Sequence, residues 1–175
     1  MHPCVHSRYN KLRMQPVRGI ICAMKNDRSS ETAIRAWARL ARAAARLQAG
    51  IEDALKTARL PPLAWYDVLF ELQRAKPVGL RQFEIGSRTL LPKYNLSRLL
   101  DKLESEALVR REACEEDGRG NVVRITDAGT ALLKRMWVIY GAEIEGRVGS
   151  KLSPDEQVSL AVMLGKLGGA PESES

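Results

Sequence analysis

The sequence is poor in the residues that most often perform catalysis or bind metals. Its 175 residues include two histidines, His2 and His6, and three cysteines, Cys4, Cys22 and Cys114. It contains no CxxC, HExxH, GxSxG or phosphate-loop pattern. We therefore expect no enzyme activity, no metal site and no cofactor. An odd number of cysteines without a spacing motif also argues against a disulfide framework and favours a reducing cytoplasm.

Long apolar runs are also missing, although 45% of the residues are hydrophobic. No run approaches the roughly 18 residues that a membrane-spanning helix needs. The first residues are basic, but no uninterrupted apolar segment follows them, which argues against a secretory signal. The length suits one folded domain with a core of its own. We expect a cytoplasmic protein that does not associate with membranes.

Acidic residues are scarce at one end of the chain, so the net charge of +7 is unevenly distributed. Residues 1–28 carry +5 of it and show no hydrophobic period, which predicts a disordered basic leader. A DNA-tracking arm is the functional alternative, and a translational start at Met24 would remove most of the segment. The high isoelectric point is therefore weak evidence that the rest binds nucleic acid. Residues 171–175 are expected to be a disordered tail.

Between these ends, residues 29–170 read as a single, mainly helical domain. A helix is expected over 31–58, because Ile34 and Trp37 begin a stripe of apolar residues at helical spacing. Two more helices are expected at 127–146 and 154–167, capped by Thr126 and by a Ser153 capping box. Their wide apolar stripes exceed what one small domain can cover. We therefore expect 29–60 and 127–168 to be dimerisation segments of a homodimer.

The middle of the chain, 61–126, has the pattern of a winged helix-turn-helix. A helix that begins at Pro61-Pro62 is followed by a short helix over 81–88, with Phe83 and Ile85 pointing inward. After a turn, a helix from Pro92 to about Ala107 precedes two strands, 109–113 and 121–125, joined by a glycine-bearing loop. The expected fold class is mainly α with a small β-wing.

The helix that starts at Pro92 has the two faces that a DNA-recognition helix needs. Its leucines fall at i, i+3, i+4 and i+7 and can bury one face. The other face is polar and can bond phosphates or base edges in the major groove. The candidate DNA-contacting residues of this helix are Lys93, Tyr94, Asn95, Ser97, Arg98 and Lys102. A solvated amphipathic helix is the structural alternative.

The hairpin supplies further cationic candidates, namely Arg110, Arg111, Arg119 and Arg124. These arginines can meet phosphates or enter the minor groove, where A-tracts attract arginine. The acidic run from Glu115 to Asp117 would repel DNA if it were unpaired. We therefore expect Asp117 to pair with Arg119 and to hold the wing tip in shape.

These segments together resemble the MarR family of winged-helix regulators. The resemblance rests on LLPKYNLSRLLDKL from Leu90 onward and on Asp117-x-Arg119 followed by Ile125-Thr126. It implies an obligate homodimer whose first and last two helices intertwine. It also implies that Arg119 is the wing-tip arginine and Asp117 its structural partner. Gly86, Leu90, Pro92 and Tyr94 depart from the family pattern, so the turn geometry and the operator sequence stay open.

The family commonly responds to small aromatic or phenolic acids, so the resemblance also implies an effector site. Its candidate residues are Trp37, Arg39, Trp65 and Tyr66. The alternative is that both tryptophans belong to the core and that Arg39 is solvated. Some family members sense oxidants through a cysteine in the first long helix, which this sequence lacks. A redox role for Cys22 or Cys114 is open, and for Cys114 a structural role is the expectation.

The function expected from these patterns is a homodimeric, sequence-specific transcriptional regulator. Its partners would be double-stranded DNA with a pseudo-palindromic operator, a second copy of itself and a small aromatic or phenolic effector. We expect a repressor that the effector releases from DNA. Two alternatives remain: a winged-helix scaffold or adaptor for protein–protein contacts without DNA binding, and a DNA architectural protein that ignores ligands.

Overall fold

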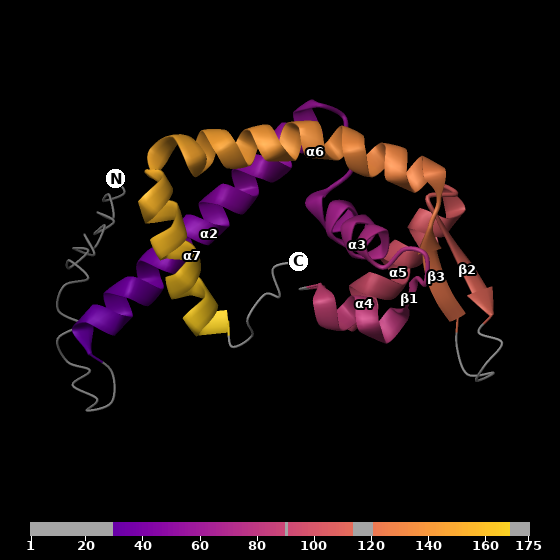
Figure 1. The fold of residues 1–175 in the computed structure, drawn as a ribbon, viewed down its shortest axis with the longest axis horizontal. Helices are drawn as coiled ribbons and strands as arrows, with labels where there is room; N and C mark the ends of the chain where they lie inside the picture. Colours follow the sequence, from indigo (N-terminus) through magenta and orange to yellow (C-terminus); the bar gives the residue numbers. More distant parts are fainter. Residues whose placement is uncertain (1–29, 90, 114–120, 169–175) are drawn as a thin grey trace, which may run out of the picture. The chain divides into compact units, whose positions relative to one another are not determined.

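The computed structural model describes residues 30–89, 91–113 and 121–168 (Figure 1). The chain divides into two compact units, residues 1–41 and 42–175. The elements are α2 (Glu31–Thr57), α3 (Leu63–Arg74), β1 (Leu80–Arg81), α4 (Gln82–Arg88), α5 (Lys93–Ser105), β2 (Val109–Ala113), β3 (Asn121–Ile125), α6 (Asp127–Arg147), the 3-10 helix η1 (Gly149–Lys151) and α7 (Pro154–Gly168). The predicted fold class, mainly α with a small antiparallel sheet, is confirmed.

Three of the helices, α2, α6 and α7, begin after a residue with a hydroxyl group. The Ser30 hydroxyl accepts a hydrogen bond from the Ala33 N–H at 3.1 Å, which caps α2. The Thr126 hydroxyl accepts from the Gly129 N–H at 3.1 Å and caps α6. Before α7, the Ser153 N–H donates to the Glu156 carboxylate at 2.8 Å, and the Glu156 N–H donates to the Ser153 hydroxyl at 3.3 Å. These bonds satisfy N–H groups that the first turn of a helix cannot pair.

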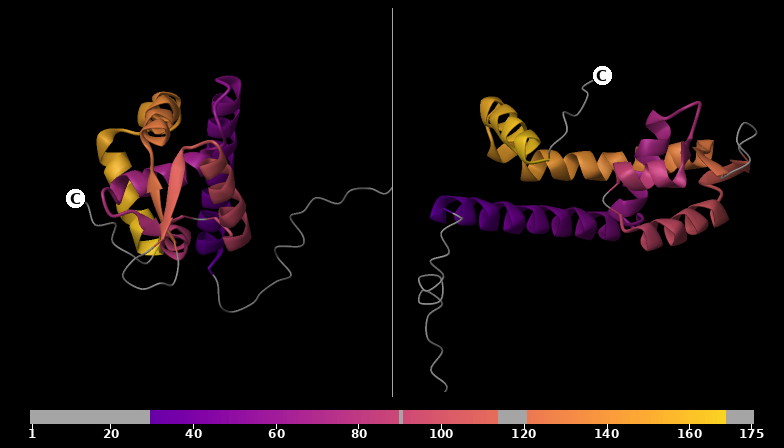
Figure 2. Two further views of the ribbon diagram at one scale, coloured as in Figure 1. Left: turned by 90° about the vertical axis from the view of Figure 1, so that its right-hand side faces the viewer. Right: turned by 90° about the horizontal axis from the view of Figure 1, so that it is seen from below.

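The three strands form an antiparallel sheet in the order β1-β3-β2. Strands β2 and β3 have the predicted bounds, and they pair from Val109 opposite Ile125 to Ala113 opposite Asn121. Strand β1 was not predicted; Leu80 pairs with Val123 on the other edge of β3. Figure 2 shows the sheet beside the first turn of α6, which directly follows β3. Helix α5 packs against β2. The chain therefore places the hairpin next to the predicted recognition helix.

The core joins α3, α4, α5 and the sheet. Its fully buried residues include Leu69 of α3, Ile85 of α4, Leu100 of α5 and Val123 of β3. Each such side chain contributes about 1.5–3 kcal/mol when it is removed from water. The prediction for Phe83 was wrong, because this ring is 70% exposed. Residues two apart lie about 200° apart around a helix, so Ile85 and Phe83 cannot both face the core.

Several helices leave apolar side chains in solvent. Helix α7 has no buried residue. Its exposed apolar residues are Val158, Val162, Met163, Leu164 and Leu167. In α2, Ile34 and Trp37 are 48% and 69% exposed. Within the described residues, no helix is both long and apolar enough to span a membrane.

Candidate nucleic-acid interface

Helix α5 is fixed by one apolar face, which determines what its other face presents. Leu96, Leu100 and Leu103 are at most 1% exposed, so the helix cannot rotate without uncovering them. The Leu96 N–H donates to the Pro92 carbonyl at 3.0 Å, so helical bonding begins at Pro92. Proline suits this position because its ring sets a helix-compatible φ and its missing N–H would have no partner there.

The outward face of the first half of α5 is polar and accessible. Lys93, Tyr94, Asn95 and Arg98 are exposed, and Ser97 is half-buried. These five predicted contact residues therefore lie together on one helix. A helix of this width fits the major groove of B-DNA, which is about 12 Å wide. Lysine, asparagine and arginine supply the donors that such a groove can use.

Arg98 lies against an aromatic ring of its own helix. Its guanidinium carbon is 4.5 Å from the centroid of the Tyr94 ring. Arg98 and Lys93 take part in no ion pair with an acid among the residues that the structure describes. Two cations at the start of α5 are therefore available to an anionic partner.

The other predicted cations have acidic neighbours. Lys102 pairs with Glu106 at 2.9 Å. In the hairpin, Glu112 bridges two arginines, since its oxygens lie 2.7 Å from Arg110 Nε and 2.7 Å from Arg124 Nε. Arg124 also donates to the Pro77 carbonyl, which connects β3 to the loop before β1. These pairs reduce the positive charge that the hairpin offers.

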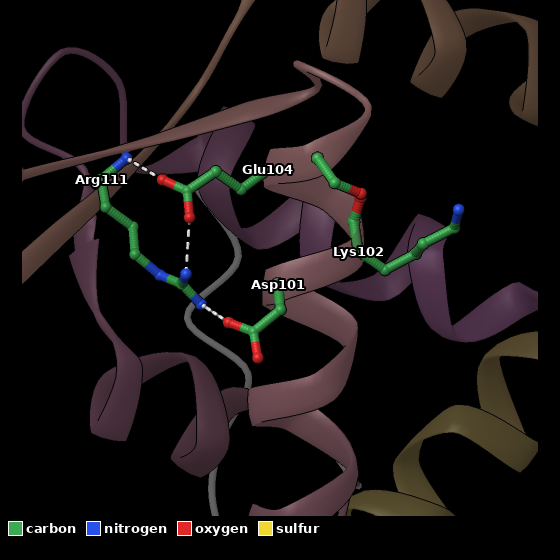
Figure 3. Close-up of polar contacts among 5 residues, drawn as sticks. Asp101, Lys102, Glu104 and Arg111 are labelled. Atoms are coloured by element: carbon green, nitrogen blue, oxygen red, sulfur yellow. Dashed lines mark hydrogen bonds and ion pairs between the residues drawn. The ribbon is translucent and has the colours of Figure 1, made fainter.

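Arg111 is more enclosed than Lys102 or Arg110, and Figure 3 shows its surroundings. Its guanidinium donates to Glu104 at 2.6 Å and to Asp101 at 2.6 Å. Its backbone N–H donates to the other Glu104 oxygen at 3.2 Å. The side chain is 21% exposed. Three hydrogen bonds therefore connect β2 to the second half of α5, where Asp101 and Glu104 bind an arginine of the hairpin.

Sequence reasoning missed Glu112, although a signal was present. Residues two apart in a strand share a face, so Arg110, Glu112 and their cross-strand neighbour Arg124 could have been grouped from the two predicted strands. The partners of Arg111 could not, because nothing local specifies how β2 packs on α5. The predicted pair Asp117–Arg119, together with Cys114, lies outside the described residues, as does Leu90 in the turn.

Comparisons with known proteins agree on one family. The model of the MarR family matches residues 60–120. The HTH-type transcriptional regulator YkoM of Bacillus subtilis (strain 168) is 39% identical over 103 residues, which cover 59% of this chain and 65% of YkoM. Sco3205, a MarR family transcriptional regulator from Streptomyces coelicolor solved in complex with DNA, is 26% identical, with a TM-score of 0.74 over 84% of this chain and 92% of that one. Over its winged region, residues 60–120, this chain is similar to the MarR family.

A third relative was solved with a ligand. This chain is 26% identical to the PcaV transcriptional regulator from Streptomyces coelicolor, solved in complex with its natural ligand. The TM-score is 0.62, and the match covers 74% of this chain and 91% of PcaV.

Away from α5, helices α3 and α6 bring together a group of aromatic side chains. The Tyr66 ring stacks on Phe70 at 5.7 Å between centroids and meets Tyr140 edge-on at 4.9 Å. Trp137 lies 6.2 Å from Tyr66 and 5.9 Å from Tyr140. We call Tyr66, Phe70, Trp137 and Tyr140 the aromatic cluster. Tyr66 is 7% exposed, whereas Trp137 is 52% exposed, so the cluster extends from the core to the surface.

Of the four predicted effector residues, only Tyr66 belongs to the aromatic cluster. Trp65 is partly buried and packs against the core. Trp37 and Arg39 are exposed residues of α2 and belong to the other compact unit. Spacing alone could not find the cluster, because its α3 and α6 members are far apart in the sequence.

The surroundings of the aromatic cluster are acidic. Burial raises the pKa of the Tyr66 phenol to about 12, with smaller contributions from Tyr140 and Asp67. Burial also raises the pKa of Asp67, and the carboxylates of Glu52 and Glu71 raise it further. Glu52 accepts the Leu63 N–H at 3.2 Å, at the start of α3. The cluster also has a cationic neighbour, because the Arg74 guanidinium carbon lies 5.8 Å from the centroid of the Phe70 ring.

Proposed function

We propose that this chain is a sequence-specific DNA-binding transcriptional regulator. The observation that supports this most is the outward face of α5, where Lys93 and Arg98 lie without acidic partners within the described chain, beside the Asn95 amide. Arginine can bond guanine O6 and N7, and asparagine can bond adenine N6 and N7, each with about 1–3 kcal/mol of discrimination. The DNA complex of Sco3205 supports the same assignment.

We divide the remaining predicted contacts by their environment. Lys93, Tyr94, Asn95, Ser97 and Arg98 would face the major groove. Lys102 and Arg110 are exposed enough to exchange an acid for a phosphate at the edge of the interface. Arg119, braced by Asp117, would meet the minor groove at the wing tip. Arg111 would act indirectly, because its donors already bind Asp101 and Glu104.

We also propose that the regulator is a homodimer. Helix α7 has no buried residue, and five of its apolar side chains are at least 39% exposed. Exposed apolar surface of this extent on one helix is typical of an interface between subunits. A two-fold pair would present two copies of α5 about 34 Å apart, one turn of DNA, which fits a pseudo-palindromic operator.

A repressor released by a small aromatic ligand is the form of regulation that we propose. The aromatic cluster offers ring faces and edges at the surface of α3 and α6, and PcaV was solved with its natural ligand. Because the acid Asp67 and the cation Arg74 both lie near the cluster, a phenol and an aromatic carboxylate are both candidates. Titration with matched phenols and benzoates would separate the two classes.

The test of DNA recognition is a binding titration with the DNA upstream of the chain's own gene. Wild-type protein should bind this fragment more tightly than a scrambled fragment of equal length at every salt concentration. The Lys93→Glu/Arg98→Glu variant should lose this preference because both cations face the DNA. Phosphate contacts alone give a steep salt dependence that is the same for both fragments.

The adaptor alternative makes the opposite prediction for the same variant. A winged helix that contacts only proteins would tolerate reversed charge on α5, and wild-type protein would show equal affinity for both fragments. Either result would overturn the proposed function. A DNA architectural protein would instead bind DNA but show no thermal shift with any phenol.

A further inference from the structure

Arg98 has two possible partners on its own helix, one aromatic and one acidic. Tyr94 precedes it by four residues and Asp101 follows it by three, and both spacings bring side chains together on a helix surface. The guanidinium lies over the Tyr94 ring at 4.5 Å. Asp101 instead accepts from Arg111 at 2.6 Å. Whether Arg98 contacts Tyr94 or Asp101 therefore depends on Arg111 of β2, which binds Asp101.

Arg111 holds Asp101 in a defined direction. It binds Glu104 with its side chain at 2.6 Å and with its backbone N–H at 3.2 Å, so it is anchored on the same helix one turn further along. Figure 3 shows the Arg111 guanidinium between the two carboxylates, with Asp101 turned toward it. The arrangement engages Asp101, the acid three residues after Arg98, with a different arginine.

Contact with a ring leaves the hydrogen-bonding capacity of arginine intact. The guanidinium interacts with the ring through its charge, whereas its five N–H donors point outward in its own plane. An ion pair with Asp101 would use two of those donors and neutralise the charge. Arg98 over Tyr94 is therefore restricted in orientation while its donors stay available for the two acceptors of guanine.

We propose that Tyr94 is a specificity-determining residue that orients Arg98 for guanine, and that Arg111 preserves this state by holding Asp101. Tyr94 acts through its ring, so its hydroxyl is dispensable. Arg111 is a positioning residue that touches no base. The proposal rests on the proposed function, since it concerns how the same helix reads DNA.

The first experiment begins by selecting bound sequences from a random pool of duplexes with wild-type protein. The guanine read by Arg98 is the base pair at which Arg98→Ala loses its preference. At that position wild-type protein should prefer guanine about 10- to 100-fold. Tyr94→Phe should keep this preference within about twofold, whereas Tyr94→Leu should lose about two- to fivefold of it, the size of an exposed cation–π contact.

Two results would overturn the role of Tyr94. One is full guanine preference in Tyr94→Leu. The other is an equal loss in Tyr94→Phe and Tyr94→Leu, which would assign the effect to the hydroxyl. Lys134→Leu, which adds a leucine at an exposed position of α6, controls for a new apolar surface residue.

The second experiment tests Arg111 with a double variant. Arg111→Met frees Asp101, so guanine preference should fall toward that of Arg98→Ala. Asp101→Asn/Arg111→Met should recover most of it, because the competing charge is gone. A merely structural role for Arg111 predicts no recovery, and that outcome would overturn this part. If Arg111→Met does not fold, the Asp101→Asn variant tests the proposal instead. This variant should keep the full guanine preference, and a loss of that preference would contradict the proposal.

Failure of the proposed function has a different signature. In that case wild-type protein would select no sequence from the pool, and no variant could be compared. Wild-type protein could instead select a sequence whose guanine preference is unchanged by substitutions at Tyr94, Asp101 and Arg111. That result would support DNA recognition and overturn only the roles of Tyr94 and Arg111.

Discussion

At the level of single residues, arginine has two distinct uses in the winged region. Arg111 is 21% exposed and bonds two carboxylates, whereas Arg98 is exposed and lies over a ring. Exposed ion pairs typically contribute 0–1 kcal/mol, and Arg111 has a more enclosed, multiply bonded geometry. The same residue type therefore stabilises the lobe in one place and faces a partner in the other.

Asp67 provides a test of the acidic surroundings of the aromatic cluster. Its folded pKa is raised above the ordinary 3.8, first by burial and then by Glu52 and Glu71. A raised pKa means that the folded state binds the extra proton, so this contribution to stability is complete below 3.8 and is lost as pH rises through the folded pKa. Asp67→Asn, which resembles the protonated acid, should therefore melt at a higher temperature than wild-type protein at neutral pH.

The pH dependence distinguishes this effect from a simple packing change. The difference in melting temperature between Asp67→Asn and wild-type protein should shrink as the pH falls toward 3.8, where Asp67 becomes protonated. Thermal melts across this range supply the measurement. A difference that does not vary with pH would show that the charge of Asp67 is not the cause.

Residue environments were predictable where they follow from one element. Leu96, Leu100 and Leu103 are buried as the helical spacing predicts. The partners of Arg111 and the rings around Tyr66 depend on contacts between elements distant in the sequence, which no local period encodes. For Phe83, the wrong orientation arose from assigning two residues on opposite sides of one short helix to the same face.

At the level of elements, the junction between β3 and α6 is closely packed against the connection between α5 and β2. The Thr126 hydroxyl lies 2.8 Å from the Ala107 carbonyl and accepts the Gly129 N–H at 3.1 Å. The Thr126 N–H donates to the Leu108 carbonyl at 3.0 Å. A Cβ at Gly129 would lie 2.2 Å from the Leu108 carbonyl oxygen. The first turn of α6 therefore sits directly on the connection between α5 and β2.

Gly129→Ala should test this junction. The added methyl group meets backbone, which cannot move aside as a flexible side chain could, so the free energy of unfolding should fall by about 1–3 kcal/mol or more. Urea denaturation measures the change. Gly146→Ala is the matched control in the same helix, because a Cβ there meets nothing within 4 Å.

The control should move in the opposite direction. Alanine is favoured over glycine inside a helix by about 0.8–1 kcal/mol, so Gly146→Ala should stabilise the protein or leave it unchanged. Equal effects of the two substitutions would contradict a specific contact at Gly129.

Helices and strands were predictable where the pattern that identifies them lies within a few consecutive residues. The capping box at Ser153 and the two strands of the hairpin follow from residues a few positions apart, and their predictions were confirmed. Strand β1 has only two residues, too few to show alternation, and it exists because β3 offers an edge to Leu80. Sheet partners of this kind are determined by the folded lobe.

At the level of the whole molecule, the proposed homodimer predicts that stability depends on concentration. If the apolar residues of α7 are covered by a second copy, dilution should lower the melting temperature, because folding and association are linked. Val162→Asp places a charge at an apolar residue that is 55% exposed in the single chain. Sedimentation should show this variant as a monomer at concentrations where wild-type protein is a dimer.

A charge elsewhere on the same helix serves as the control. Ser159→Asp adds the same charge at an exposed polar position of α7 and should leave more of the dimer intact. Wild-type protein that sediments as a monomer, with a melting temperature independent of concentration, would contradict the proposed dimer.

Helix α6 has a mechanical consequence beyond stability. It is seated at Thr126 on the base of the hairpin, and it carries Trp137 and Tyr140 further along. Tyr140 is about 16 Å along the helix axis from Gly129, so a tilt of about 5° at the junction displaces it by about 1.4 Å. A small tilt at the first turn of α6 therefore corresponds to a larger displacement at the aromatic cluster. Under the proposed regulation, a bound ring that displaced Tyr140 by this amount would tilt the first turn of α6, where Gly129 lies against the Leu108 carbonyl at the base of the hairpin.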